Sequence, residues 1–135
     1  MTLRTALAVP LAGLFLVVAA QAQETATPPS PPQLAPYDAG LVRLSEILGA
    51  THYLRQLCGA GEGTLWRDQM QGLIDAEQAD STRVARLTDA FNRGYESFEA
   101  VYRSCTPAAS LAVDRYVQEG ARIARDIAAR YGREE

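Results

Sequence analysis

The chain holds few side chains that could carry metal, redox or nucleophilic chemistry. Its 135 residues include two cysteines, one histidine and no lysine, so all thirteen basic residues are arginine. Cys58 and Cys105 form neither the C-x-x-C of thiol redox sites nor the C-x-x-C-H of haem attachment. His52 lies six residues before Cys58, a spacing that places the two side chains on different faces of a helix. We therefore expect no catalytic residue, no metal site and no cofactor.

A glycine-rich run, CGAGEGT at residues 58–64, is the one segment that suggests phosphate binding. Its glycines, Gly59, Gly61 and Gly63, do not have the G-x-G-x-x-G spacing, and a helical pattern precedes them instead of a strand. Thr64 could still hold an anion through the free N–H groups of a helix N-terminus. The simpler interpretation is that the glycines end one helix and Thr64 caps the next.

The segment HYLR at residues 52–55 supplies a candidate binding site. His52 and Arg55 flank an apolar helical stripe, so they could recognise a carboxylate or a carbonyl of a partner. In the alternative interpretation they form hydrogen bonds to neighbouring helix ends or to a carboxylate such as Glu46 or Glu99. The sequence leaves both interpretations open.

The only tryptophan, Trp66, follows the glycine run. If buried it is a core anchor, and if exposed it is a hot spot for a partner. The candidate partner-binding residues are His52, Tyr53, Arg55, Leu57 and Trp66.

The first 22 residues have the features of a secretory signal peptide. They contain one arginine, an uncharged apolar run at residues 6–20 and the small-x-small cleavage site Ala20-Gln21-Ala22. The run is shorter than the roughly 20 residues of a membrane span, although a permanent N-terminal anchor is the alternative. We expect cleavage after Ala22, export to the periplasm and no stable membrane anchor afterwards.

Residues 23–36 form a proline-rich linker that contains five of the seven prolines. Such a sequence disfavours helix and central strand and favours polyproline II. It is either a spacer ahead of the folded domain or a proline-rich ligand for a partner.

Residues 37–135 show helical periodicity and no alternating pattern typical of strands. The pattern predicts four helices, which are helix one at about 38–58 with Asp38 as cap, helix two at 64–79, helix three from Asp80 or Ser81 to Cys105, and helix four from Thr106-Pro107 to Gly132. Short connections favour antiparallel neighbours, so the predicted fold is an all-α, antiparallel four-helix bundle-like domain. Gly94 lies on the apolar face of the third helix, where a missing side chain lets a neighbouring helix approach closely.

The two cysteines fit this topology. Because the first and third helices run in the same direction, Cys58 and Cys105 reach the same end of the bundle. An oxidising compartment joins such a pair, and the loop closed would stabilise the fold by about 4 kcal/mol. We expect a disulfide, with two free thiols as the alternative.

The composition excludes some classes of protein. Apolar residues make up 47% of the chain and charged residues 21%, which is typical of a globular domain. The net charge is −3 and no basic block is present, so we expect no nucleic-acid partner.

Two segments, LGATHYLRQLCG at residues 48–59 and FNRGYESFEAVYRSC at residues 91–105, carry a family resemblance. With the signal peptide and the proline-rich start, they resemble an uncharacterised family of small exported alphaproteobacterial proteins, of which two widely spaced cysteines are the hallmark. The resemblance implies a disulfide-bonded helical protein of the periplasm. It supplies no catalytic or binding residue.

These observations favour a non-enzymatic periplasmic helical module that binds another cell-envelope protein. The wide apolar face of the first helix and the shortage of catalytic side chains support this hypothesis. The alternatives are an inhibitor of an envelope hydrolase, a small-ligand carrier, or a hydrolase with an unfamiliar site.

Overall fold

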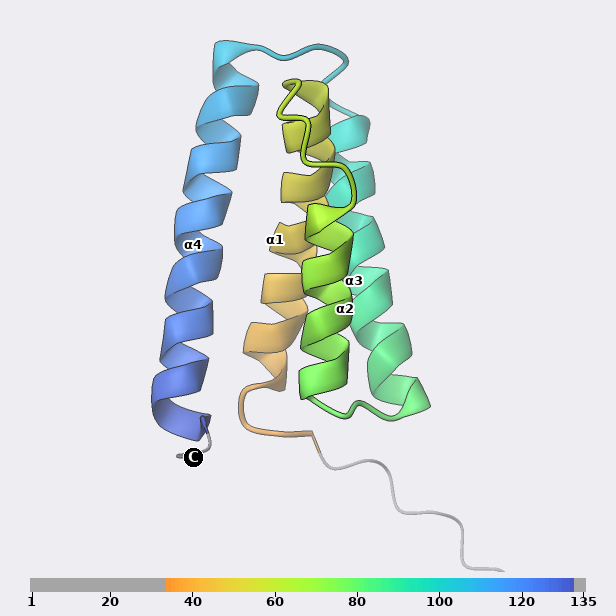
Figure 1. Ribbon diagram of the computed structural model, residues 1–135, viewed down its shortest axis with the longest axis vertical. Coiled ribbons are helices and arrows are strands. Elements are labelled where there is room, and N and C mark those ends of the chain that lie inside the picture. The colour runs from red at the N-terminus through yellow and green to blue at the C-terminus, as the bar shows by residue number, and fades with distance from the viewer. Residues whose placement is uncertain (1–33, 133–135) are drawn as a thin grey trace, which may run out of the picture. The chain divides into compact units, whose positions relative to one another are not determined.

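The computed structural model describes residues 34–132, which form four helices and no strand. The helices are α1 (Asp38–Leu57), α2 (Leu65–Ala76), α3 (Ser81–Glu99) and α4 (Pro107–Tyr131). They run alternately up and down, so α1 and α3 point one way and α2 and α4 the other (Figure 1). The predicted all-α, antiparallel bundle-like fold is confirmed. The predicted signal peptide, residues 1–22, and most of the linker lie outside the described residues.

The starts of α3 and α4 follow from the capping residues in the sequence. The Asp80 carboxylate accepts a hydrogen bond from the backbone N–H of Arg83 at 2.9 Å. The Thr106 hydroxyl accepts one from the backbone N–H of Ala109 at 3.1 Å. Pro107 is the first residue of α4, where its missing N–H leaves no hydrogen bond unmade. Both predicted starts are confirmed.

The predicted caps of α1 and α2 are different in the structure. The N-cap of α1 is Tyr37, and the carboxylate of Asp38 instead accepts a hydrogen bond from the Arg83 side chain at 2.9 Å. Thr64 occupies the N-cap position of α2, but its hydroxyl donates to the Asp68 carboxylate at 2.8 Å. In both cases the side chain bonds to a charged side chain and not to a backbone N–H in the first turn of the helix.

α3 is shorter than the apolar pattern predicts. It ends at Glu99, six residues before Cys105. The backbone N–H of Tyr102 still bonds to the carbonyl of Phe98 at 2.8 Å, and beyond it the chain leaves the helix. Because a residue before proline avoids the helical conformation, Thr106 is extended with φ −116° and ψ 162°. A connecting segment therefore has to separate α3 from α4.

The turn after α1 depends on glycine. Gly59, Gly61 and Gly63 have φ values of +72°, +67° and +56°, which lie in the left-handed region that side chains disfavour. α1 ends at Leu57, directly before this turn. The predicted helix end is confirmed.

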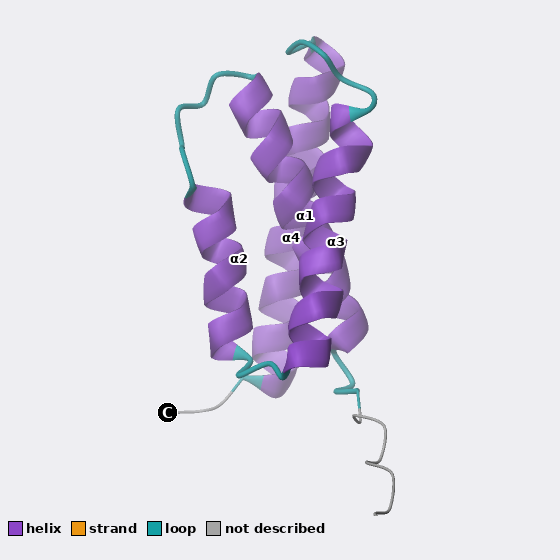
Figure 2. Ribbon diagram, turned by 90° about the vertical axis from the view of Figure 1, so that its right-hand side faces the viewer, coloured by secondary structure: helices purple, strands orange, loops and turns teal. Residues whose placement is uncertain are grey.

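α1 is the central helix of the domain. It packs against α2, α3 and α4, whereas within residues 34–132 no Cα atom of α4 lies within 8 Å of α2 or α3. Figure 2 shows the same four helices from the side, joined by loops. The wide apolar face predicted for this segment reflects the three helices packed around it.

The interior consists of two apolar clusters along α1. Leu41 packs with Met70, Leu87 and Phe91 toward the N-terminal end of α1. Leu54 packs with Ala109 and Val113 at the end that carries the cysteines. Because α1 contributes to both clusters, its side chains connect the two ends of the domain.

Candidate functional site

His52 lies inside the bundle with 1% of its surface exposed. Its ring lies 6.0 Å from that of Phe91 and 5.8 Å from that of Tyr95, centroid to centroid. Among the described residues neither ring nitrogen has a hydrogen-bond partner, so the bonds to a helix end or a carboxylate that the sequence suggested are not formed. Burial and, secondly, the charge of Arg67 lower the pKa of His52.

Tyr53 and Leu57 pack against the cluster around Leu54. The Tyr53 hydroxyl donates to the backbone carbonyl of Tyr102, and its ring meets that of Tyr95 edge-on at 5.2 Å. Both side chains are half-buried. The structure therefore uses these two candidate residues in contacts within the domain.

Arg55 and Trp66 meet at one carboxylate. The Arg55 Nε donates to Glu62 Oε2 at 3.0 Å, and the Trp66 indole N–H donates to the same oxygen at 2.6 Å. Since Glu62 lies in the glycine-rich turn, the contact fastens this turn to α1 and α2. Hydrogen bonds from Arg55 and then Trp66 hold the pKa of Glu62 at about 2, so this carboxylate stays ionised.

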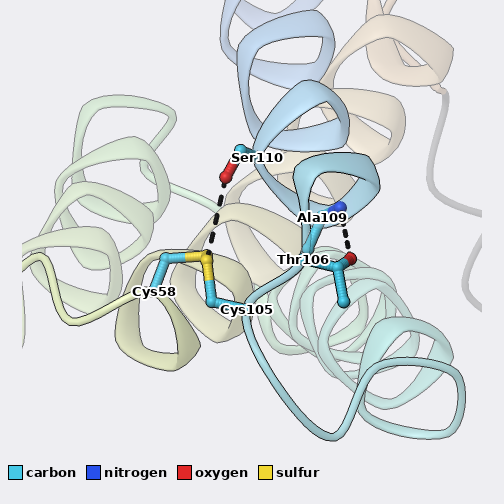
Figure 3. The surroundings of a disulfide bond; sticks show 5 residues. All are labelled: Cys58, Cys105, Thr106, Ala109 and Ser110. Atoms are coloured by element: carbon cyan, nitrogen blue, oxygen red, sulfur yellow. Dashed lines mark hydrogen bonds between the residues drawn. A yellow bond between two sulfur atoms is a disulfide. The ribbon is translucent and has the colours of Figure 1, made fainter.

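The predicted disulfide is present. Cys58 and Cys105 are joined with an S–S distance of 1.99 Å and a Cα–Cα distance of 4.9 Å. Figure 3 shows the bond beside the start of α4, where the Ser110 oxygen lies 3.7 Å from the Cys105 sulfur. The disulfide links the end of α1 to the segment that leads into α4.

A groove lies over α1, between α2 and α4. Its volume is about 480 Å³, and α1 supplies the floor while the other two helices supply the walls. The floor residues are Leu44, Ile47, Leu48 and Thr51. The wall residues include Trp66, Gly72 and Leu73 of α2 and Val117, Gly120, Ala121 and Ala124 of α4. We call this feature the α2/α4 groove.

The α2/α4 groove continues toward the start of α1. A second hollow of about 250 Å³ shares Leu44, Leu73 and Ala124 with the first and reaches Tyr37 and Tyr131. The two aromatic rings at its end lie 5.0 Å apart, centroid to centroid. From Thr51 to Tyr37 the floor is roughly 21 Å long at the rise of an α-helix.

Thr51 is the polar exception in the floor of the α2/α4 groove. Its side chain is 0% exposed, and within the described part of the chain its hydroxyl oxygen has no hydrogen-bond partner. A buried hydroxyl without a partner destabilises a protein by about 1–3 kcal/mol. The Thr51 hydroxyl is therefore a polar group that this part of the fold leaves unpaired.

The sequence analysis missed the α2/α4 groove. Small residues at helical spacing, Gly72 in α2 and Ala121, Ala124 and Ala128 in α4, were its signal, because short side chains leave space between neighbouring helices. The same residues are also typical of tight helix contacts. Only the arrangement in space shows that α2 and α4 are held apart.

The described residues offer little chemistry besides this groove. Within residues 34–132 no three His, Cys, Asp or Glu side chains come close enough together to hold a metal ion. In the same range no helix is long and apolar enough to cross a membrane. His52 has neither the carboxylate nor the hydroxyl partner that a general base commonly has.

Residues 36–131 match the model of a family described as a protein of unknown function, DUF2385. The chain belongs to this family. The DUF2385 match spans all four helices and both cysteines, so the predicted membership of an uncharacterised family is confirmed. No curated protein and no solved structure matches the chain. The function of this DUF2385 protein therefore has to be argued from its own geometry.

Proposed function

We propose that this protein is a non-enzymatic periplasmic helical module that binds another cell-envelope protein in the α2/α4 groove. The observation that supports the proposal is the groove itself, an apolar channel over α1 that α2 and α4 do not close. Val117 on its rim is 39% exposed and Tyr131 at its end is 45% exposed. Contiguous exposed apolar surface on a small domain is typical of an interaction site.

The periplasmic part of the proposal rests on two features. Disulfides persist in oxidising compartments outside the cytoplasm, and Cys58 and Cys105 are joined. The first 22 residues have the pattern of a signal peptide. Together with the resemblance to exported alphaproteobacterial proteins, these features favour export to the periplasm.

A photo-crosslinking amino acid at position 72 tests the proposal in living cells. Gly72 lines the groove, and a Cβ atom added there meets nothing within 4 Å, so a larger side chain fits. The matched control position is Asp89, which is exposed on α3 and outside the groove. We expect one dominant envelope protein to be cross-linked from position 72 and not from position 89.

A pair of leucine variants on α4 makes this experiment specific. Ala124→Leu fills the groove, whereas Ala129→Leu adds the same side chain at an exposed position outside it. Capture from position 72 is expected to fall with Ala124→Leu and to persist with Ala129→Leu. Equal capture in both variants, or equal capture from positions 72 and 89, would contradict a role for the groove.

A small-ligand carrier is the second candidate, and the volume of the groove favours it. About 480 Å³ lies within the range of pockets that hold small molecules. Native mass spectrometry of the protein purified from its own cells tests this candidate. A bound small molecule that is lost with Ala124→Leu and kept with Ala129→Leu would support the carrier over the protein partner.

A further inference from the structure

α2 is the least firmly anchored helix of the domain. Of its twelve residues only Met70 is buried, whereas α1 has nine buried residues. Leu73 and Ile74 of α2 are partly buried against the same apolar cluster. Figure 2 shows α2 on one side of the other three helices. A helix that buries so little apolar surface detaches at a low cost in free energy.

Hollows lie along both sides of α2. The α2/α4 groove separates it from α4. On its other side is a hollow of about 320 Å³, which is lined by Arg67 and Met70 of α2 and by Phe91 and Tyr95 of α3, among others. We call this feature the α2/α3 hollow. α2 therefore rests on α1 with space on either side, and its neighbours do not wedge it in place.

The two ends of α2 are held by charged side chains. Before the helix, Glu62 accepts a hydrogen bond from Arg55 of α1. After it, Glu77 accepts one from Arg83 of α3 at 2.9 Å. The turn before α2 contains the three left-handed glycines, and the turn after it contains Gln78, whose φ of +46° is the one positive value outside glycine in the described chain. α2 can thus leave as one unit, pivoting at two turns, without breaking the other helices.

His52 lies beside the α2/α3 hollow, because the rings of Phe91 and Tyr95 that flank it line this hollow together with Arg67. The charge that faces His52 from α2 is Arg67, and the titratable group that faces it from α3 is Tyr95. Within residues 34–132 no carboxylate of any of the four helices bonds to either ring nitrogen. A proton taken up in this closed form would therefore place an unpaired charge in the interior, near Arg67.

Detachment of α2 removes both obstacles to protonation. Water reaches the ring of His52, and Arg67 moves away with its helix. The open form then binds the proton with the ordinary affinity of histidine, whereas burial first and Arg67 second weaken its binding in the closed form. Since the open form takes up the proton more readily, a fall in pH raises the open population.

We propose that α2 is an acid-opened strap, which leaves α1 and α3 when His52 takes up a proton while the other three helices stay folded. Opening uncovers the apolar side chains of Leu41, Leu87 and Phe91, which pack with Met70 in the closed form. It also removes one wall of the α2/α4 groove. The inference goes beyond the proposed function and holds whatever occupies that groove.

Amide hydrogen exchange of the purified, disulfide-bonded protein tests the inference at pH 7.5, 6.5 and 5.5, with rates corrected for intrinsic exchange. Protection of α2 is expected to be lower than that of α1, α3 and α4 at each pH. It is expected to fall by up to about tenfold between pH 7.5 and 5.5, the most that one histidine proton supplies. The methyl NMR signal of Met70 is a second readout, because Met1 is the only other methionine.

Four variants separate the trigger from the attachment. His52→Gln keeps a neutral polar side chain and is expected to make protection of α2 independent of pH. Arg67→Gln is expected to reduce the fall without removing it, because burial remains, and Arg125→Gln on the exposed face of α4 is its matched control. Glu62→Gln is expected to lower protection of α2 equally at all three pH values, because the pKa of Glu62 is about 2 and its carboxylate stays ionised throughout.

Three results would overturn the inference. Protection that is equal in all four helices and falls in all of them together would indicate global unfolding and no separate opening of α2. A fall that persists in His52→Gln would assign the trigger to another group. If His52→Gln does not fold, the comparison of Arg67→Gln with Arg125→Gln decides, and an equal fall in these two variants contradicts the inference.

Discussion

Gly94 of α3 lies directly against the backbone of α1 at Glu46. A Cβ atom added to Gly94 of α3 would overlap the carbonyl of Glu46 in α1. Conversely, a Cβ atom added to Gly49 of α1 would overlap the carbonyl of Phe91 in α3. α1 and α3 run in the same direction and meet here backbone to backbone. This backbone contact therefore joins two parallel helices, although helices that follow one another in the sequence are antiparallel.

Gly94→Ala is expected to lower the free energy of unfolding by about 3 kcal/mol, because the overlapping atom is backbone and one helix has to move. Gly72→Ala is the matched control, since a Cβ there meets nothing within 4 Å and alanine favours helix. This control is expected to raise the free energy of unfolding by roughly 0.5–1 kcal/mol. Urea denaturation followed by circular dichroism measures both. Equal stability of the two variants would show that the helices are not in backbone contact.

Local signals in the sequence were sufficient for much of the fold. Asp80 and Thr106 cap the backbone of the helix that follows them, and Pro107 is the first residue of its helix. The starts of α3 and α4 could therefore be predicted from the sequence. The pairing of Cys58 with Cys105 followed from helix direction alone. Each of these features depends on neighbours in the sequence or on topology.

Features that depend on long-range partners were not predictable. Asp is a residue type that often caps helices, but the carboxylate of Asp38 accepts a hydrogen bond from the side chain of Arg83, 45 residues later. The sequence left open whether His52 recognises a partner or forms hydrogen bonds inside the fold, and in the structure it is buried beside the aromatic rings of Phe91 and Tyr95. The α2/α4 groove exists because α2 and α4 do not contact each other. The separation of two helices cannot be predicted from the sequence of either one.

Removal of the disulfide by Cys58→Ser is expected to lower the free energy of unfolding by about 4 kcal/mol. The bond closes a loop with a sequence separation of 47 residues, and its loss restores the entropy of that loop to the unfolded chain. Thermal unfolding of the variant and of the reduced wild type measures the effect. Ser110→Ala, which leaves the bond intact beside Cys105, is the control. Melting of Cys58→Ser within a degree or two of wild type would contradict a stabilising role.

Stability is expected to fall as the pH is lowered through about 6.5. Burial and, secondly, the charge of Arg67 lower the pKa of His52 below its ordinary value of 6.5, so the unfolded chain binds this proton more readily than the folded one. The free energy of unfolding therefore decreases with falling pH, by at most about 1.4 kcal/mol for each pH unit. Urea titrations at pH 7.5, 6.5 and 5.5 measure this slope.

His52→Gln is the control for the pH prediction, because His52 is the only histidine of the chain. The carboxylates of Glu62 and Glu119, whose pKa values are lowered by Arg55 and Arg43, stay ionised in this range. The variant is expected to lose the slope between pH 7.5 and 5.5, whatever its absolute stability. A slope that persists in His52→Gln would assign the effect to another group.

Thr51→Val is expected to stabilise the unliganded protein by about 1 kcal/mol. The substitution removes a buried hydroxyl that has no partner among the described residues and keeps a β-branched side chain of the same shape. Urea denaturation followed by circular dichroism measures the change, and a gain in stability would show that the hydroxyl contributes nothing to the fold. Thr51→Ser, which retains the hydroxyl and loses a methyl group, is expected to be less stable than wild type. If Thr51→Val destabilises the domain, the hydroxyl has a hydrogen-bond partner inside the fold.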